Sequence, residues 1–113
     1  METYSKRQEK VSKLLQKDLA TIFQQEASLF KGALITVTKV RVSPDLSYAK
    51  VFLSIFIPNG DTSEIMTAIQ SQTPNFRYAL GKKIKNQVKK IPELAFFLDD
   101  SLDYIDNIEQ LLK

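Results

Sequence analysis

The sequence contains neither cysteine nor histidine. Without cysteine, the chain can form no disulfide and no thiolate metal site. Without histidine, it lacks the most common general base and the most common transition-metal ligand. The chain therefore has few side chains for catalysis by a nucleophile and a base, and an enzyme would have to rely on carboxylates alone. We predict a protein that is not an enzyme and that uses no cofactor and no metal.

Glycine is scarce as well. The three glycines, Gly32, Gly60 and Gly81, lie too far apart to form a glycine-rich phosphate-binding loop. No apolar run approaches the roughly 18 residues that a membrane span needs, and the N-terminus lacks the apolar core of a signal peptide. We therefore expect a cytoplasmic protein with no membrane contact. The length of 113 residues suits one domain, residues 1–113, with one core.

Acidic residues are missing from one long stretch. Between Glu64 and Glu93 the chain carries no acid and six bases, which are Arg77, Lys82, Lys83, Lys85, Lys89 and Lys90. Residues 93–113 carry six acids and one base, so the modest net charge of +3 hides a basic segment and an acidic end. A local concentration of positive charge favours a polyanionic partner.

Hydrophobic periodicity predicts elements in the order α-β-β-α-α-β-α. Ser5 and Gln8 match a capping box at the start of a helix that ends near Ala27. β-Branched residues predict strands over 34–42 and 48–57, and the short turn between them predicts an antiparallel hairpin. A third strand over 94–98 and a last helix over 102–112 follow. We predict an α+β domain in which helices cover a three-stranded sheet.

The basic segment predicts two helices joined at a sharp break. Pro74 disfavours helix at the residue before it and suits the first position of a helix, so Thr73 is the expected N-cap of the second helix. Thr62 or Ser63 is the expected cap of the first. We expect the second helix to run to Lys90.

On a helix with about 100° per residue, the bases of this second helix lie mostly outside its apolar stripe. Lys82, Lys85 and Lys89 lie opposite the stripe, and Lys83 and Lys90 lie on one shoulder. Arg77 falls within the arc of the stripe, so it must extend outward or serve the structure. Three bases of the first helix are candidate extensions of the surface: Lys6, Arg7 and Lys10.

A lysine-rich helix face is often merely solvated. Solvated faces usually mix charges, however, and this one has no carboxylate. We therefore interpret the lysines as phosphate contacts, which supply affinity and register but read little sequence. Two alternatives stay open: a protein-interaction module with an incidental basic helix, and a generic nucleic-acid-binding module. Recognition of DNA would favour a dimer, which nothing in the sequence indicates, so we expect a monomer.

Two other groups of side chains have a structural and a functional interpretation. Tyr48, Phe52 and Phe56 share one face of the second strand, which suits sheet packing and would also suit base stacking. Asp99 and Asp100 resemble a metal pair, but a helix cap and a turn explain them better.

The local sequences of these elements resemble those of the ribosome-binding factor A family. The resemblance is carried by ITVT at 35–38, VSPDLSYAKV at 42–51, LGK at 80–82 and PELAFFLDDSL at 92–102. It covers about residues 5–112, and the order of elements resembles the type II KH fold. The resemblance implies a protein without enzymatic activity that binds the small (30S) ribosomal subunit and its 16S rRNA. It also implies a role in late 16S rRNA processing and subunit maturation, and support of growth in the cold.

The break between the paired helices departs from the family pattern. KH domains that grip single strands usually carry GxxG there, and this family has an Ala-x-Gly kink. Here the position reads Gln72-Thr73-Pro74, without alanine or glycine. We expect Pro74 to keep the break, but this backbone cannot approach a phosphate as a glycine loop does.

Overall fold

The computed structural model describes residues 4–26, 30, 32–58 and 60–99. Along these residues the elements are α1 (Lys6–Gln25), β1 (Leu34–Val42), β2 (Tyr48–Phe56), α2 (Thr62–Ser71), α3 (Thr73–Ile84) and β3 (Glu93–Leu98). The predicted order α-β-β-α-α-β is confirmed. The helix predicted over 102–112 lies outside the described residues.

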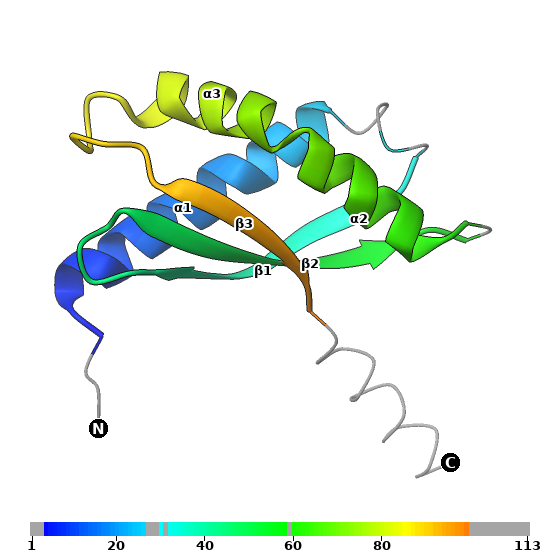
Figure 1. Ribbon diagram of the computed structural model, residues 1–113, viewed down its shortest axis with the longest axis horizontal. Helices are drawn as coiled ribbons and strands as arrows, with labels where there is room; N and C mark the ends of the chain where they lie inside the picture. The colour runs from blue at the N-terminus through cyan, green and yellow to red at the C-terminus, as the bar shows by residue number, and fades with distance from the viewer. Residues whose placement is uncertain (1–3, 27–29, 31, 59, 100–113) are drawn as a thin grey trace, which may run out of the picture.

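The three strands form one sheet in the order β1-β2-β3. β1 and β2 pair antiparallel as the predicted hairpin, and β3 joins β2 in parallel, with Tyr48 opposite Glu93. In Figure 1 the helices lie on one side of this sheet, with α1 behind α2 and α3. The α+β architecture, with a three-stranded sheet covered by helices, is therefore confirmed.

A bulge interrupts the pairing of β1 with β2. The register shifts between Val37 and Lys39, so Thr38 has no direct partner in β2. Its hydroxyl donates a hydrogen bond to the Asp99 carboxylate at 2.5 Å. Asp99 follows β3 directly, so this contact ties the two outer strands together across β2. Among the described residues, no group of three or more potential ligands could hold a metal ion.

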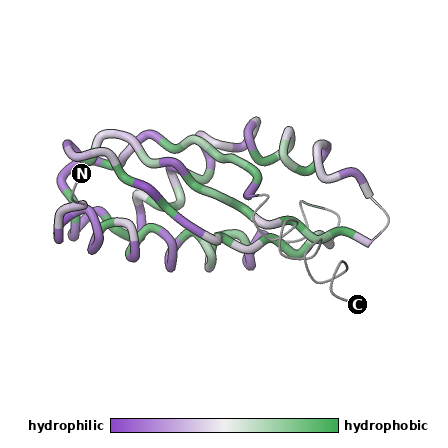
Figure 2. Tube along the Cα trace, turned by 90° about the horizontal axis from the view of Figure 1, so that it is seen from below, coloured by the Kyte–Doolittle hydropathy of each residue, from purple (hydrophilic) through white to green (hydrophobic). Residues whose placement is uncertain are grey.

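Alternation along β2 separates two faces of the sheet. Ala49, Val51 and Leu53 are fully buried beneath the helices, whereas Tyr48 and Phe56 are exposed on the other face. Figure 2 shows the same division in the helices, whose hydrophilic residues lie on the outer turns. One face of the sheet thus supplies the core, as the period of two in a strand requires.

Four phenylalanines join the layers of the core. The ring of Phe23 in α1 lies 4.7 Å from that of Phe76 in α3 and 5.9 Å from that of Phe96 in β3. Phe30, which precedes β1, lies 6.1 Å from Phe76. All four side chains are buried. Edge and tilted contacts of this kind add to the hydrophobic stabilisation, and they fix α3 against both α1 and the sheet.

The first turn of α1 is anchored to the end of β1. The predicted capping box is confirmed, since Ser5 and Gln8 exchange backbone and side-chain hydrogen bonds. The buried amide of Gln8 also donates to the carbonyl of Val42 at 2.9 Å. The amide of Val42 in turn donates to the Tyr4 hydroxyl at 2.7 Å. This network holds the basic start of α1 beside the turn that connects β1 to β2.

Within the described ranges, no helix is both long and apolar enough to cross a membrane.

A candidate nucleic-acid interface

The predicted break between the paired helices is present, and it is one residue long. Gln72 is both the C-cap of α2 and the N-cap of α3, with φ −94° and ψ 7°. Thr73 was the expected cap, and this prediction is wrong. Its hydroxyl donates instead to the carbonyl of Gln70 at 2.9 Å. With so short a junction, Thr73 already has helical geometry and its side chain satisfies a free carbonyl of α2.

The start of α2 also differs from the prediction of Thr62 or Ser63 as its cap. Asp61 caps α2, and its carboxylate accepts hydrogen bonds from the amide and hydroxyl of Ser63 at 2.9 and 2.7 Å. These hydrogen bonds lower the pKa of Asp61. A carboxylate also interacts more favourably with the helix dipole than a hydroxyl does, which is the physical reason for the correction.

The second basic helix is shorter than expected. α3 ends at Ile84, with Lys85 as its C-cap, so the prediction of a helix to Lys90 is wrong. Glu93 must pair with Tyr48 to begin β3, and Pro92 disfavours helix at the residue before it. The chain therefore needs residues 85–92 as a loop that turns back to the sheet.

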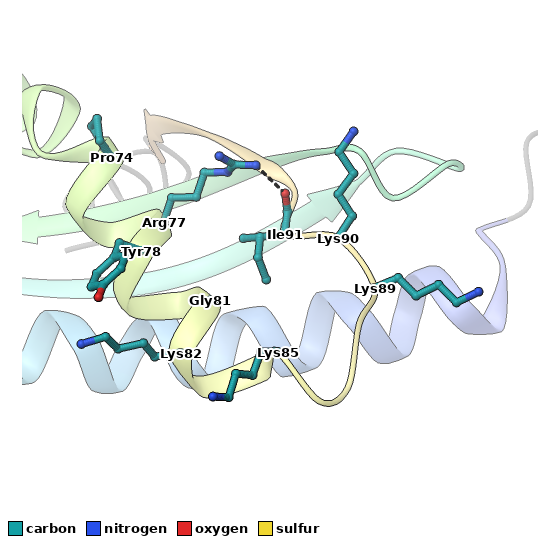
Figure 3. A pocket seen from close by; sticks show the side chains of 9 residues that line it. All are labelled: Pro74, Arg77, Tyr78, Gly81, Lys82, Lys85, Lys89, Lys90 and Ile91. Carbon is teal, nitrogen blue, oxygen red and sulfur yellow. Dashed lines mark hydrogen bonds between the residues drawn. The ribbon is translucent and has the colours of Figure 1, made fainter.

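This loop and α3 enclose an open groove, which we call the basic groove. Its volume is about 640 Å³. The lining residues are Pro74, Arg77, Tyr78, Gly81, Lys82, Lys85, Lys89, Lys90 and Ile91, none of which is acidic. In Figure 3, Lys82 and Lys85 extend from the end of α3, whereas Lys89 and Lys90 extend from the loop. The groove therefore gathers four of the five predicted lysines, although two of them are not on the helix. Lys83 is exposed on α3 and is not among the lining residues.

Arg77 is half-buried and holds the loop. Its Nη2 donates to the carbonyl of Ile91 at 2.8 Å, drawn as a dashed line in Figure 3, and its Nε donates to the carbonyl of Pro92 at 3.1 Å. The planar guanidinium thus addresses two consecutive carbonyls. Of the two roles that its position in the apolar arc allowed, these contacts support the structural one.

Arg7, at the basic start of α1, lies next to the groove. A second cavity of about 110 Å³ is lined by Arg7 together with Lys89 and Lys90 of the loop. Lys6 and Lys10 are exposed on α1 but line neither cavity. Of the three candidate extensions, the structure therefore brings Arg7 next to the groove.

One carboxylate lies at the edge of this surface. Asp45 also lines the second cavity. Hydrogen bonds from the hydroxyls of Ser47 and Ser43 lower the pKa of Asp45 to about 2. Asp45 is therefore anionic at neutral pH, and its charge marks a boundary of the basic surface next to Arg7.

Tyr78 is a groove residue that the sequence analysis missed. Its side chain is 68% exposed, and the Lys82 ammonium lies 4.6 Å from the centre of its ring. Its position on the helix could have predicted its exposure. Tyr78 falls about 160° from Leu80, between Lys85 and Lys82 on the face opposite the apolar stripe. Tyrosine is neither a base nor a typical member of an apolar stripe, so neither pattern on this helix pointed to it.

The aromatic residues of the outer sheet face form a separate surface. Phe52 lies 5.7 Å from Phe97 of β3, and the Lys39 ammonium lies 4.7 Å from the Phe52 ring. Phe56 is 62% exposed. The cross-strand pair supports the sheet-packing interpretation of Phe52, and the basic groove lies on the helical side of the sheet.

Comparisons of sequence and of structure with known proteins both find members of one family. The family model "Ribosome-binding factor A" matches residues 7–112. The ribosome-binding factor A of Cytophaga hutchinsonii is 43% identical over 109 residues, covering 96% of this chain and 81% of that protein. The crystal structure of the Thermus thermophilus factor has a TM-score of 0.67 at 23% identity, covering 80% of this chain and 94% of that one. A homology model of the Thermus factor, fitted into a cryo-EM map of its complex with the 30S subunit, has a TM-score of 0.61 at 24% identity. It covers 77% of this chain and 89% of that one.

Proposed function

This chain belongs to the ribosome-binding factor A family, and we propose that it binds the small ribosomal subunit by docking its basic groove on 16S rRNA. The observation that carries the proposal is the gathering of Lys82, Lys85, Lys89 and Lys90 around one groove with no acid in its lining. The Thermus relative in complex with the 30S subunit supports the choice of partner.

The proposed mechanism uses binding energy alone. Flexible lysines act as point charges on the phosphates of the rRNA backbone, and Arg7 extends the contact toward α1. A protein that binds one conformation of immature rRNA better than another shifts the population toward it. In this way the protein would assist late 16S rRNA processing and subunit maturation without catalysing a reaction. We also propose that it acts as a monomer in the cytoplasm.

Four lysine–phosphate contacts have a measurable consequence. The logarithm of the binding constant falls by about 0.7 to 0.9 per contact for each tenfold rise in salt. Between 50 and 200 mM salt, affinity for the subunit should therefore fall by about 50- to 150-fold. A protein-interaction module whose lysines are incidental would lack this dependence on the groove.

The test is co-sedimentation with purified 30S subunits over a salt series. We expect the wild type to pellet with subunits, and a Lys82→Glu/Lys85→Glu/Lys89→Glu variant to remain folded in the supernatant. A matched control is Lys13→Glu/Lys17→Glu/Lys50→Glu, which makes the same change in net charge at exposed positions outside the groove. If both variants lose binding equally, total charge governs association and the groove does not. If the groove variant still pellets, the site lies elsewhere.

A further inference from the structure

Tyr78 occupies the groove without contributing to the core. Two thirds of its surface is exposed, whereas its helical neighbours Phe76 and Leu80 are buried. An exposed tyrosine loses little conformational entropy when a partner immobilises its ring, which makes tyrosine a frequent contact residue at interfaces. The same groove is lined by four lysines, two at the end of α3 and two in the loop that follows it.

Small and apolar residues line the groove near the ring. Gly81 lies one turn after Tyr78, and because it has no side chain, Ile91 of the loop packs close to its backbone, where an added Cβ would meet Ile91 at 3.4 Å. Pro74 lies one turn before Tyr78 and also lines the groove. Tyr78, Gly81 and Ile91 all line the groove, and Figure 3 shows the Tyr78 ring beside Lys82. The groove is thus apolar along its floor and basic along its rim, and its volume of about 640 Å³ suits a nucleotide-sized ligand.

The Lys82 ammonium now covers one face of the ring at 4.6 Å. This contact is weak at an exposed site, and the flexible lysine stem can move its charge to a nearby phosphate. The ring would then be free to receive a base. An aromatic platform with cations beside it is the arrangement that proteins use to hold unpaired nucleotides, with stacking for the base and charge for the backbone.

We infer that Tyr78 stacks on an unpaired nucleobase of the bound RNA, while Lys82 and Lys85 contact the phosphates that flank it. The inference rests on the proposed function, because it specifies what the groove selects. A base inside a duplex hides both faces in the stack, so Tyr78 can reach only a nucleotide that lies outside a helix. The groove therefore discriminates RNA with a bulged or single-stranded nucleotide from fully paired RNA.

The chain has no tryptophan, so a Tyr78→Trp variant carries one tryptophan, in the groove, whose emission can be excited selectively over that of the remaining tyrosines. Two RNA duplexes serve as probes, identical except that one carries a bulged adenine. We expect the bulged duplex to quench this fluorescence in a saturable manner and the paired duplex to leave it unchanged. The matched control is Phe56→Trp, which places the fluorophore at an exposed position on the outer sheet face.

Binding by two further variants separates stacking from other roles. Replacement of a stacking residue by alanine weakens binding by about 5- to 150-fold per base. Tyr78→Ala should therefore bind the bulged duplex more weakly by this factor and bind the paired duplex as the wild type does. Tyr78→Phe should keep the wild-type affinity for both duplexes, because stacking does not need the hydroxyl. Lys82→Ala should weaken the binding of both duplexes, because each of them offers phosphates to this lysine.

Several results would overturn the inference. Equal quenching by the two duplexes, or a bulge preference that survives in Tyr78→Ala, would show that no base stacks on this ring. Quenching of Phe56→Trp but not of Tyr78→Trp would assign stacking to the outer sheet face. In each case a wild type that still pellets with 30S subunits through its groove lysines leaves the proposed function intact. A wild type that fails to pellet would refute the proposed function and this inference together.

Discussion

Arg77 allows a test of how the basic groove is built. If its main role is to clamp the loop of residues 85–92, then Arg77→Lys should destabilise the fold although it keeps the charge. The guanidinium reaches the carbonyls of Ile91 and Pro92 at 2.8 and 3.1 Å with two different nitrogens. A lysine ammonium is a point donor on a flexible stem and cannot address both carbonyls with the same fixed geometry.

The expected loss follows from these two contacts. A hydrogen bond from a charged donor contributes about 1.5 to 3 kcal/mol. Arg77 is only half-buried, so the lower end of this range applies, and a lysine would recover part of one bond. We expect Arg77→Lys to lower the free energy of unfolding by about 2 kcal/mol, and Arg77→Ala by about 3 kcal/mol. With a urea m-value of about 1.5 kcal/mol/M, the first change moves the midpoint by about 1.3 M.

The assay is urea denaturation followed by circular dichroism, with Lys83→Ala as the control. Lys83 is exposed on the same helix and lines neither cavity, so its substitution should change stability by less than about 0.5 kcal/mol. If Arg77→Lys unfolds at the wild-type midpoint but binds 30S subunits weakly, Arg77 contacts RNA directly and the clamp is wrong.

Two further predictions concern the core and the turn beside the groove. Phe76→Ala removes the ring that contacts the three other core phenylalanines, and should cost about 3 to 5 kcal/mol of stability, measured by urea denaturation; a loss below 1 kcal/mol would contradict this packing. The pKa of Asp45 is lowered from 3.8 to about 2 in the folded state, so its stabilising contribution is present above pH 3.8 and is lost as pH falls toward 2. Thermal unfolding between pH 5 and 2 should therefore show a steeper loss of stability for the wild type than for Asp45→Asn, and parallel curves would refute the role of its hydrogen bonds.

Local patterns predicted the parts of this fold whose causes are local. The capping box of Ser5 and Gln8 uses residues three apart, and both hydrogen bonds are present. The period of two put Tyr48, Phe52 and Phe56 on one face of β2, and the structure shows that the opposite face, with Ala49, Val51 and Leu53, is the buried one. Pro74 located the break between α2 and α3 to within a residue. In each case the covalent geometry or the side-chain period restricts the chain whatever surrounds it.

The end of α3 was predicted wrongly because a distant partner decides where that helix ends. Nothing near Ile84 in the sequence requires α3 to end there. The end is set by the need to bring Glu93 beside Tyr48, forty-five positions earlier in the chain. The N-cap of α3 was misplaced by one residue for a local reason, since the short junction lets the Thr73 hydroxyl donate back to the carbonyl of Gln70 in α2.

The same division applies to the candidate site. The absence of acids between Glu64 and Glu93 is a property of the sequence alone, and it was enough to predict a cationic surface. Only the tertiary structure placed Lys89 and Lys90 across a groove from α3, brought Arg7 to its edge, and exposed Tyr78 within it. Charge is carried by each residue wherever it lies, whereas a groove exists only between segments that packing has brought together. For this reason the sequence determined what kind of partner the surface favours, and the fold decided which residues can meet it at once.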